Sequence, residues 1–131
     1  MKQIPISPPG APAPVGPYSP ALVWGNLVFI SGQGPLDPNT GKLVKGDVTE
    51  QVLQVFANID TLLNASGSNR KCVLKVTVYL ANMDDFQKMN DVYSEYFQGV
   101  IYPARTTIQA ARLPLDIGVE IDVIAYRDDK V

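Results

Sequence analysis

The sequence contains no histidine and only one cysteine, Cys72, among its 131 residues. Histidine is the side chain that most often acts as an acid–base group near neutral pH and as a metal ligand. Zinc sites are built from cysteine, histidine and carboxylate ligands, so a metal site is not expected. Hydrolases that depend on a Ser-His-Asp or Cys-His arrangement are excluded as they are usually built. A lone cysteine cannot form an intrachain disulfide, and Cys72 at the start of an apolar stretch is typical of a small core residue.

The chain also lacks an excess of positive charge and a long apolar run. Eleven Lys and Arg side chains stand against 13 Asp and Glu, which gives a formal net charge of −2. Proteins that bind phosphate backbones usually carry a basic excess, so a nucleic-acid partner is disfavoured. No apolar stretch approaches the ~20 residues of a membrane-spanning helix, and the proline-rich N-terminus does not resemble a secretion signal. We therefore expect a cytoplasmic protein without a membrane partner, folded as one domain over residues 1–131.

Proline, glycine and apolar periodicity divide the chain into a series of elements. Seven of the 11 prolines lie within residues 1–20, which predicts an extended lead-in on the surface. Apolar residues recur at helical spacing over 47–67, where Asp47 is a candidate N-cap and Gly67 a candidate stop. A second helix is predicted at 84–98. Strands are predicted at 22–24, 27–30, 72–80, 105–111 and 118–126.

This order of elements predicts an α+β fold, in which two helices pack against one mixed sheet. In the final strand, apolar residues such as Ile121 alternate with acids such as Glu120 and Asp122. One side of that strand is therefore dry, while the other mixes acids with apolar groups. A sheet face of this kind often becomes buried in an oligomer.

Arg105 and Glu120 are the charged residues that best fit a role in catalysis. Pro103 fixes the approach to Arg105, whose forked guanidinium suits a carboxylate; the alternative is an ordinary surface ion pair. Glu120 is suited to orienting or activating a water molecule, and the alternative is a solvated acid on an edge strand. If residues 112–117 make a hairpin turn, Gln109 lies opposite Glu120 and Arg105 lies about 13 Å further along. The two side chains would then meet more easily across a subunit interface than within one hairpin.

Weaker signals come from Asn90 and from the segment around Ser31. Asn90 shares a stripe of the second predicted helix with Tyr93, so its amide faces inward, and burying it unpaired would cost ~1–3 kcal/mol. A hydrogen bond to a neighbouring loop is a simpler explanation for this amide than contact with a ligand. Ser31 and Gly32 end an apolar strand, where backbone N–H groups become free to meet an anion.

Several short motifs stand in a fixed order along the whole chain. They are GPYS (16–19), ISGQ (30–33), DPNTG (37–41), MN-x-x-Y (89–93), PAR (103–105), ARLP (111–114) and VEI (119–121). In order and spacing these motifs resemble those of the RidA/YjgF family, the reactive intermediate deaminases.

The resemblance implies a chorismate-mutase-like α+β subunit and a homotrimer whose sheets close into a central β-barrel, with ligand pockets at the three interfaces. It also implies hydrolysis of 2-aminoacrylate and related enamines or imines to 2-keto acids and ammonia, without a cofactor. By the same resemblance, Arg105 binds the substrate carboxylate and Glu120 positions water. The residues that match the family's pocket are Tyr18, Ser31, Gly32 and Asn90.

Thr107 departs from the family pattern, because many members have cysteine at this position. If only the backbone N–H at this position contributes to substrate binding, threonine serves as well, and we favour that interpretation. If a thiol is needed, a module that binds small 2-keto acids without turnover becomes the alternative. Another hypothesis is an endoribonuclease or translation inhibitor, a label that some family members carry, which the acidic charge and the lack of histidine disfavour.

Overall fold

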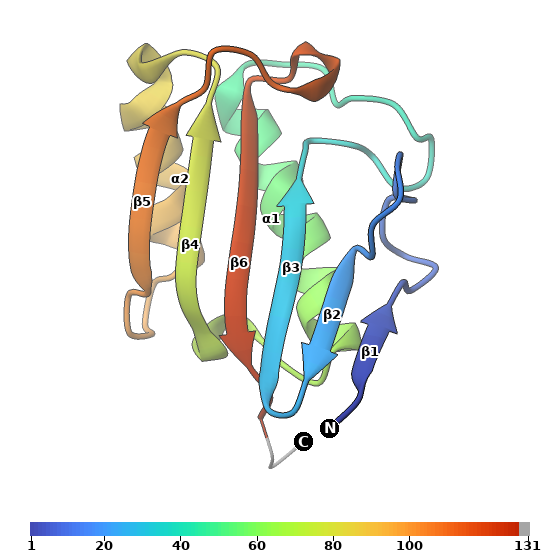
Figure 1. Ribbon diagram of the computed structural model, residues 1–131. Coiled ribbons are helices and arrows are strands. Elements are labelled where there is room, and N and C mark those ends of the chain that lie inside the picture. The colour runs from blue at the N-terminus through green and yellow to red at the C-terminus, as the bar shows by residue number, and fades with distance from the viewer. Residues whose placement is uncertain (129–131) are drawn as a thin grey trace.

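Residues 1–128 are described in the computed structural model, and their strands form one mixed sheet with helices on one face (Figure 1). The helices are α1 (Val48–Ala65) and α2 (Phe86–Tyr96), so both predicted helices and the α+β class are confirmed. The strands are β1 (Gln3–Ile6), β2 (Ala21–Trp24), β3 (Leu27–Gln33), β4 (Val73–Leu80), β5 (Ala104–Gln109) and β6 (Val119–Tyr126). Their order in the sheet is β1-β2-β3-β6-β4-β5. Strand β1, within the extended lead-in, was not predicted.

The local sequence explains where α1 begins and ends. The Asp47 carboxylate accepts a hydrogen bond from the Thr49 N–H at 2.9 Å, and the Glu50 carboxylate accepts one from the Asp47 N–H at 3.0 Å. This reciprocal capping box confirms the predicted N-cap. The helix ends before Gly67, whose φ of +76° lies in the left-handed region that favours glycine. Its buried stripe comprises Val48, Val52, Val55, Phe56, Asn58, Ile59, Leu62 and Leu63.

An aromatic cluster fixes α2 against α1. The ring of Phe56 stacks on that of Tyr96 with centroids 4.0 Å apart, and it meets Tyr93 and Phe97 edge-on at 6.0 Å. Each aromatic pair contributes ~0.5–1.5 kcal/mol beyond the area that it buries. The cluster therefore holds the stripe of α2 that carries Asn90 in a fixed orientation toward the sheet.

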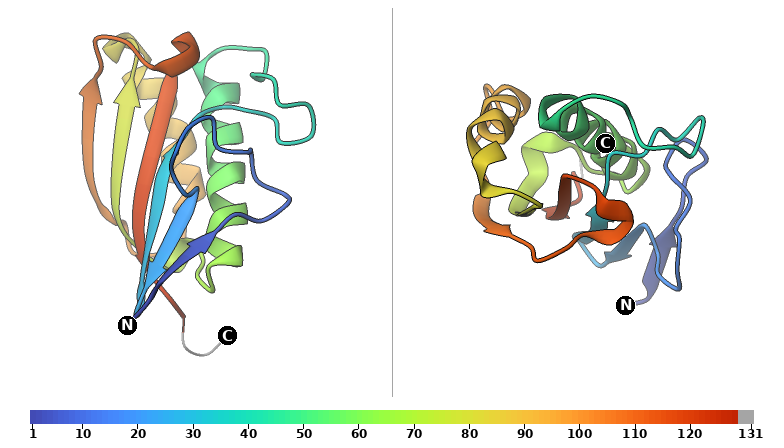
Figure 2. Two further views of the ribbon diagram at one scale, coloured as in Figure 1. Left: turned by 45° about the vertical axis from the view of Figure 1, so that its right-hand side comes forward. Right: turned by 90° about the horizontal axis from the view of Figure 1, so that it is seen from above.

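The sheet has one dry face and one open face. Buried and partly exposed residues alternate along β6, which confirms the predicted two-sided strand. The buried side lies under the helices, and Figure 2 shows that neither helix covers the other side. The open face carries large apolar side chains that are 38–45% exposed, namely Trp24, Phe29, Ile108 and Tyr126. Exposed apolar area of this kind favours association with another chain.

The predicted hairpin between the last two strands is wrong. Strand β4 lies between β5 and β6, pairing in parallel with β5 and antiparallel with β6. Residues 110–118 pass over the end of β4, where the Ala110 N–H donates to the Leu80 carbonyl at 2.8 Å and the Ala81 N–H to the Gly118 carbonyl at 3.0 Å. These bonds hold the connection in place, and the helical crossover through α2 accounts for the parallel pairing of β4 with β5.

Asn58 is a buried amide on α1 that the sequence analysis missed, although it lies within an apolar stripe. Its Nδ2 donates to the carbonyls of Gly34 and Leu36 at 3.2 and 2.9 Å, and its Oδ1 accepts from Gln54 at 3.0 Å. The side chain is only 1% exposed. Asn58 thus joins α1 to the loop that follows β3.

We expect Asn58→Leu to lower the free energy of unfolding by ~1–3 kcal/mol. The carbonyls of Gly34 and Leu36 lose their hydrogen-bond donor, and leucine cannot supply another. Chemical denaturation measures this difference. Asn64→Leu, at an exposed position of the same helix, is the matched control. Equal losses in the two variants would contradict the role assigned to Asn58.

Candidate active site

Arg105 lies on the helix-facing side of β5, held by α2. Its Nη1 donates to Asn90 Oδ1 at 2.7 Å. Its guanidinium carbon lies 4.6 Å from the ring centroid of Tyr93 and 5.6 Å from that of Phe86. Cation–π contacts of this length stabilise and orient a guanidinium. The inward amide of Asn90 therefore has a specific partner, which is Arg105 rather than a loop.

A cleft of about 420 Å³ opens beside this guanidinium. The ion pairs found among the described residues include Lys88 with Asp47 and Arg112 with Asp116, and none of them involves Arg105. Its remaining N–H groups are suited to a bidentate contact with an anion. The residues that line the cleft are Gln87, Asn90, Asp91, Tyr93, Ser94, Tyr102, Pro103 and Arg105.

Glu120 lies on the open face of the sheet, beside Asp122 on the same strand. Partial burial raises the pKa of the Glu120 carboxyl, and the negative charge of Asp122 raises it further. Asp122 is itself held by the Tyr79 hydroxyl, which donates to its Oδ2 at 2.9 Å. Gly32 leaves room for the Glu120 carboxylate, because a methyl group at position 32 would force that carboxylate to move.

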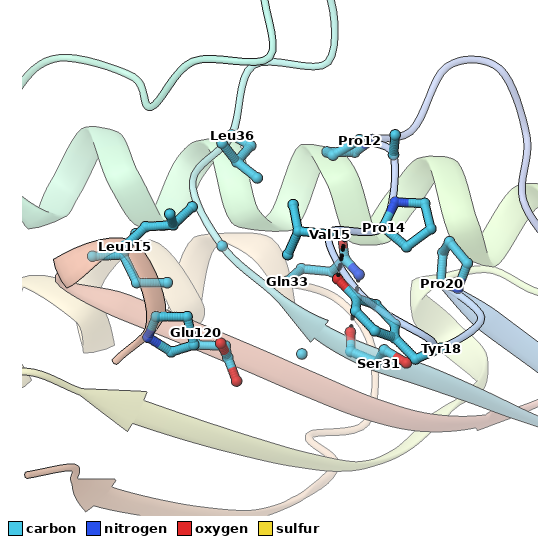
Figure 3. Close-up of a pocket in the computed structure, with 15 residues that line it drawn as sticks. Pro12, Pro14, Val15, Tyr18, Pro20, Ser31, Gln33, Leu36, Leu115 and Glu120 are labelled. Carbon is cyan, nitrogen blue, oxygen red and sulfur yellow. Dashed lines mark hydrogen bonds between the residues drawn. The ribbon is translucent and has the colours of Figure 1, made fainter. Parts of the chain in front are cut away.

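A second cavity of about 300 Å³ surrounds Glu120 (Figure 3). It brings together four of the predicted site residues: Tyr18, Ser31, Gly32 and Glu120. Residues 12–15 of the proline-rich lead-in form one wall, and residues 114, 115 and 117 form another. The Tyr18 hydroxyl accepts a hydrogen bond from the Val15 N–H at 3.3 Å, a local bond between two residues of the lead-in that both line the cavity.

The expectation that the Ser31 N–H is free to meet an anion is wrong. That N–H donates to the Pro20 carbonyl at 3.0 Å, and the Ser31 hydroxyl donates to the Ser19 carbonyl at 2.7 Å. These bonds continue the antiparallel pairing of β2 with β3 beyond Ala21 and Ile30, so this segment is bonded to the end of the lead-in. Ser31 thereby fixes the wall of the cavity.

Arg105 and Glu120 lie on opposite faces of the same sheet. Arg105 pairs through Val76 with Val123, and both valines are buried under the helices. Glu120 pairs with Tyr79 on the open face. Two strand spacings and three residues separate the two backbone positions, about 14 Å in all. One chain therefore assembles two separate groups of site residues. The two charges do not meet within one chain, as predicted, but the reason is that they lie on opposite faces of the sheet and not the register of a hairpin.

Thr107 lies on the same side of β5 as Arg105, two residues further along. Its hydroxyl is buried and makes no hydrogen bond among the residues described, and the same is true of the Tyr93 hydroxyl. Burial raises the pKa of Tyr93 to about 12, against the opposing charge of Arg105. An unpaired buried hydroxyl costs free energy, so the fold alone does not explain why position 107 carries one.

No group of three or more His, Cys, Asp and Glu side chains within residues 1–128 is placed to hold a metal ion. None of the helices described is long and apolar enough to cross a membrane.

A family model described as Endoribonuclease L-PSP matches residues 9–127, and a RutC family protein of Pyrococcus horikoshii is 51% identical, covering 98% of this chain and 100% of its own. The mouse 2-iminobutanoate/2-iminopropanoate deaminase is 46% identical, covering 93% of this chain and 90% of its own. The chain belongs to the RidA/YjgF family. Among solved RidA/YjgF structures, E. coli TdcF with bound serine aligns with a TM-score of 0.91 at 35% identity, covering 95% of this chain and 99% of that one. The resemblance seen in the motifs is therefore confirmed, and RidA/YjgF relatives include one named for imine deamination.

Proposed function

We propose that the protein hydrolyses the C=N bond of reactive imines that carry a carboxylate, such as those formed from 2-aminoacrylate, to give 2-keto acids and ammonia. The observation that carries this proposal is that the two cavities hold complementary chemical groups. One holds a guanidinium without a carboxylate partner, and the other holds a carboxylate whose pKa is raised by burial. The names of the relatives and the family motifs agree with this chemistry.

The proposed site lies at an interface between subunits of a homotrimer. Because Arg105 and Glu120 lie on opposite faces of the sheet, Arg105 of one subunit has to work beside Glu120 of the next. Strand β5 is an edge strand, so the cleft of Arg105 lies at the rim of the subunit. The apolar open face supplies area that such an assembly would bury.

The reaction follows from these positions. The enamine tautomerises to an imine, and Arg105 binds its carboxylate and fixes the orientation of the C=N carbon. A water molecule held by Glu120 adds its oxygen to that carbon and gives a proton to the carboxylate. The proton passes from Glu120 to the nitrogen of the carbinolamine. Glu120 then takes the proton of the carbinolamine hydroxyl and passes it to the nitrogen, so that the C=O bond forms as the C–N bond breaks, and ammonia and the 2-keto acid leave.

A coupled assay tests the function directly. A dehydratase generates 2-aminoacrylate with and without this protein, and the rate of pyruvate formation is followed. We expect an increase that scales with the protein concentration, and the absence of any increase with folded protein would overturn the proposal. Calorimetric binding of 2-oxobutyrate without turnover would support the binding module, and salt-sensitive RNA binding would support the nuclease.

The pH dependence of the rate is expected to follow the ionisation of Glu120. Water is held by the ionised carboxylate, so activity falls as the pH drops through the raised pKa of Glu120. Asp122→Asn removes a neighbouring negative charge, which lowers the pKa of Glu120 and moves the acidic limb to lower pH. Rate profiles of the variant and of the exposed control Asp84→Asn measure this movement. A limb that moves equally in both, or toward higher pH, would contradict the assignment.

A further inference from the structure

The wall of the Glu120 cavity contains two consecutive residues in a left-handed conformation. Leu115 has a φ of +60° and Asp116 a φ of +52°. This region is disfavoured for residues with a side chain, and most of all for large apolar ones. The Asp116 carboxylate accepts hydrogen bonds from the Arg112 Nε and Nη2 at 2.8 and 3.2 Å. The backbone N–H of Asp116 donates to the Leu113 carbonyl at 3.1 Å. Several hydrogen bonds thus hold the loop in a backbone conformation that is unfavourable in free energy.

The Leu115 side chain lies outside the hydrophobic core. Leu115 is 59% exposed, yet it lines the cavity on the same side as Glu120. Val15 lies across the cavity from it and is 74% exposed (Figure 3). Substitutions at positions so exposed usually change stability little. Strain that places an exposed apolar group beside a reactive carboxylate points to a role in binding.

We propose that Leu115 and Val15, on facing sides of the cavity, give it an apolar lining, called here the hydrocarbon wall, that selects imines with a longer apolar side chain. The inference rests on the proposed deaminase function. An imine carbon carries a nitrogen, a carboxylate and a side chain. Arg105 is assigned to the carboxylate and Glu120 to the water that attacks the carbon. The side chain is then the substituent left to meet the cavity wall, whose other apolar residues include Pro12, Pro14, Leu36 and Ile117.

The test compares two imines, one with a methyl side chain, formed from alanine, and one with an isobutyl side chain, formed from leucine. Both are generated in place by an amino-acid oxidase, and kcat/KM is measured for each. The quantity of interest is the ratio of isobutyl to methyl kcat/KM. Each buried methylene contributes about fourfold, so we expect the ratio to fall about tenfold in Leu115→Gly and Leu115→Asn.

These two replacements separate selectivity from stability. Glycine and asparagine both accept a positive φ, so we expect the melting temperature to stay constant or to rise while the ratio falls. Val15→Thr keeps the shape of the side chain and is expected to lower the ratio in the same direction. Leu53→Ala, which truncates a leucine that is 53% exposed on α1, is the control and should leave the ratio as it is.

Three results would overturn the inference. An unchanged ratio in both Leu115 variants would show that the hydrocarbon wall does not select substrates, and it would not affect the proposed deaminase function. Dissociation of those variants into monomers, seen by size-exclusion chromatography, would assign Leu115 to the subunit interface instead. A wild-type protein that hydrolyses neither imine would remove the proposed function and this inference together.

Discussion

Replacing Arg105 with alanine is expected to lower kcat/KM for 2-aminoacrylate by about 10²–10³-fold while the fold stays intact. A bidentate contact between guanidinium and carboxylate makes two charge-assisted hydrogen bonds, each contributing ~1.5–3 kcal/mol. In the structure Arg105 contacts one amide and two rings at the edge of the sheet, so its removal leaves no buried charge unpaired. Steady-state kinetics and a thermal melt of the same preparation measure both effects.

Two controls separate geometry from charge. Arg105→Lys keeps the charge but loses the fork, so we expect it to recover only part of the lost activity, mainly as a raised KM. Lys71→Ala removes an exposed cation elsewhere in the chain and should leave the kinetics as they are. Activity near that of the wild type in Arg105→Ala would show that the guanidinium does not bind the substrate.

Glu120→Gln is expected to lower kcat by about 10²–10³-fold with little change in KM, because the amide can fill the space but cannot accept a proton. The same change should not destabilise the protein. The folded state raises the pKa of Glu120, so it binds the proton more tightly than the unfolded state does, and ionisation opposes folding as the pH rises through that raised pKa. At neutral pH the uncharged variant is therefore expected to melt at the same temperature or higher.

Glu95→Gln supplies the matched control, since Glu95 is an exposed acid on α2. It should change neither kcat nor the melting temperature. A Glu120→Gln variant with full kcat would exclude the carboxylate from proton transfer, whatever its effect on stability.

The helices of this protein could be predicted from its sequence because their signals are local. The capping box at Asp47 and the stop at Gly67 place α1 to within two residues. The two faces of β6 could be predicted for the same reason, since alternation is visible in eight consecutive residues. Strand β1 was missed because Pro5 argues against a strand, although proline is tolerated at the edge of a sheet where β1 lies.

The pairing of strands and the faces of the site residues could not be predicted in the same way. The sequence places Arg105 and Glu120 on successive strands, which suggested a hairpin, whereas β4 lies between them. The side on which Arg105 lies depends on its register with Val76, a contact between residues far apart in the chain. The role of Asn58 could not be predicted because its hydrogen-bond partners are backbone carbonyls of a loop, and every residue type has such a carbonyl.

The central claim is that one active site takes its arginine and its glutamate from different subunits. Arg105→Ala and Glu120→Gln chains, each inactive alone, can be co-expressed in equal amounts and purified as mixed oligomers. A site then has one chance in two of an intact Arg105 and one in two of an intact Glu120 from the next subunit, so about a quarter of wild-type activity should return. Mixed oligomers as inactive as either parent would contradict the claim.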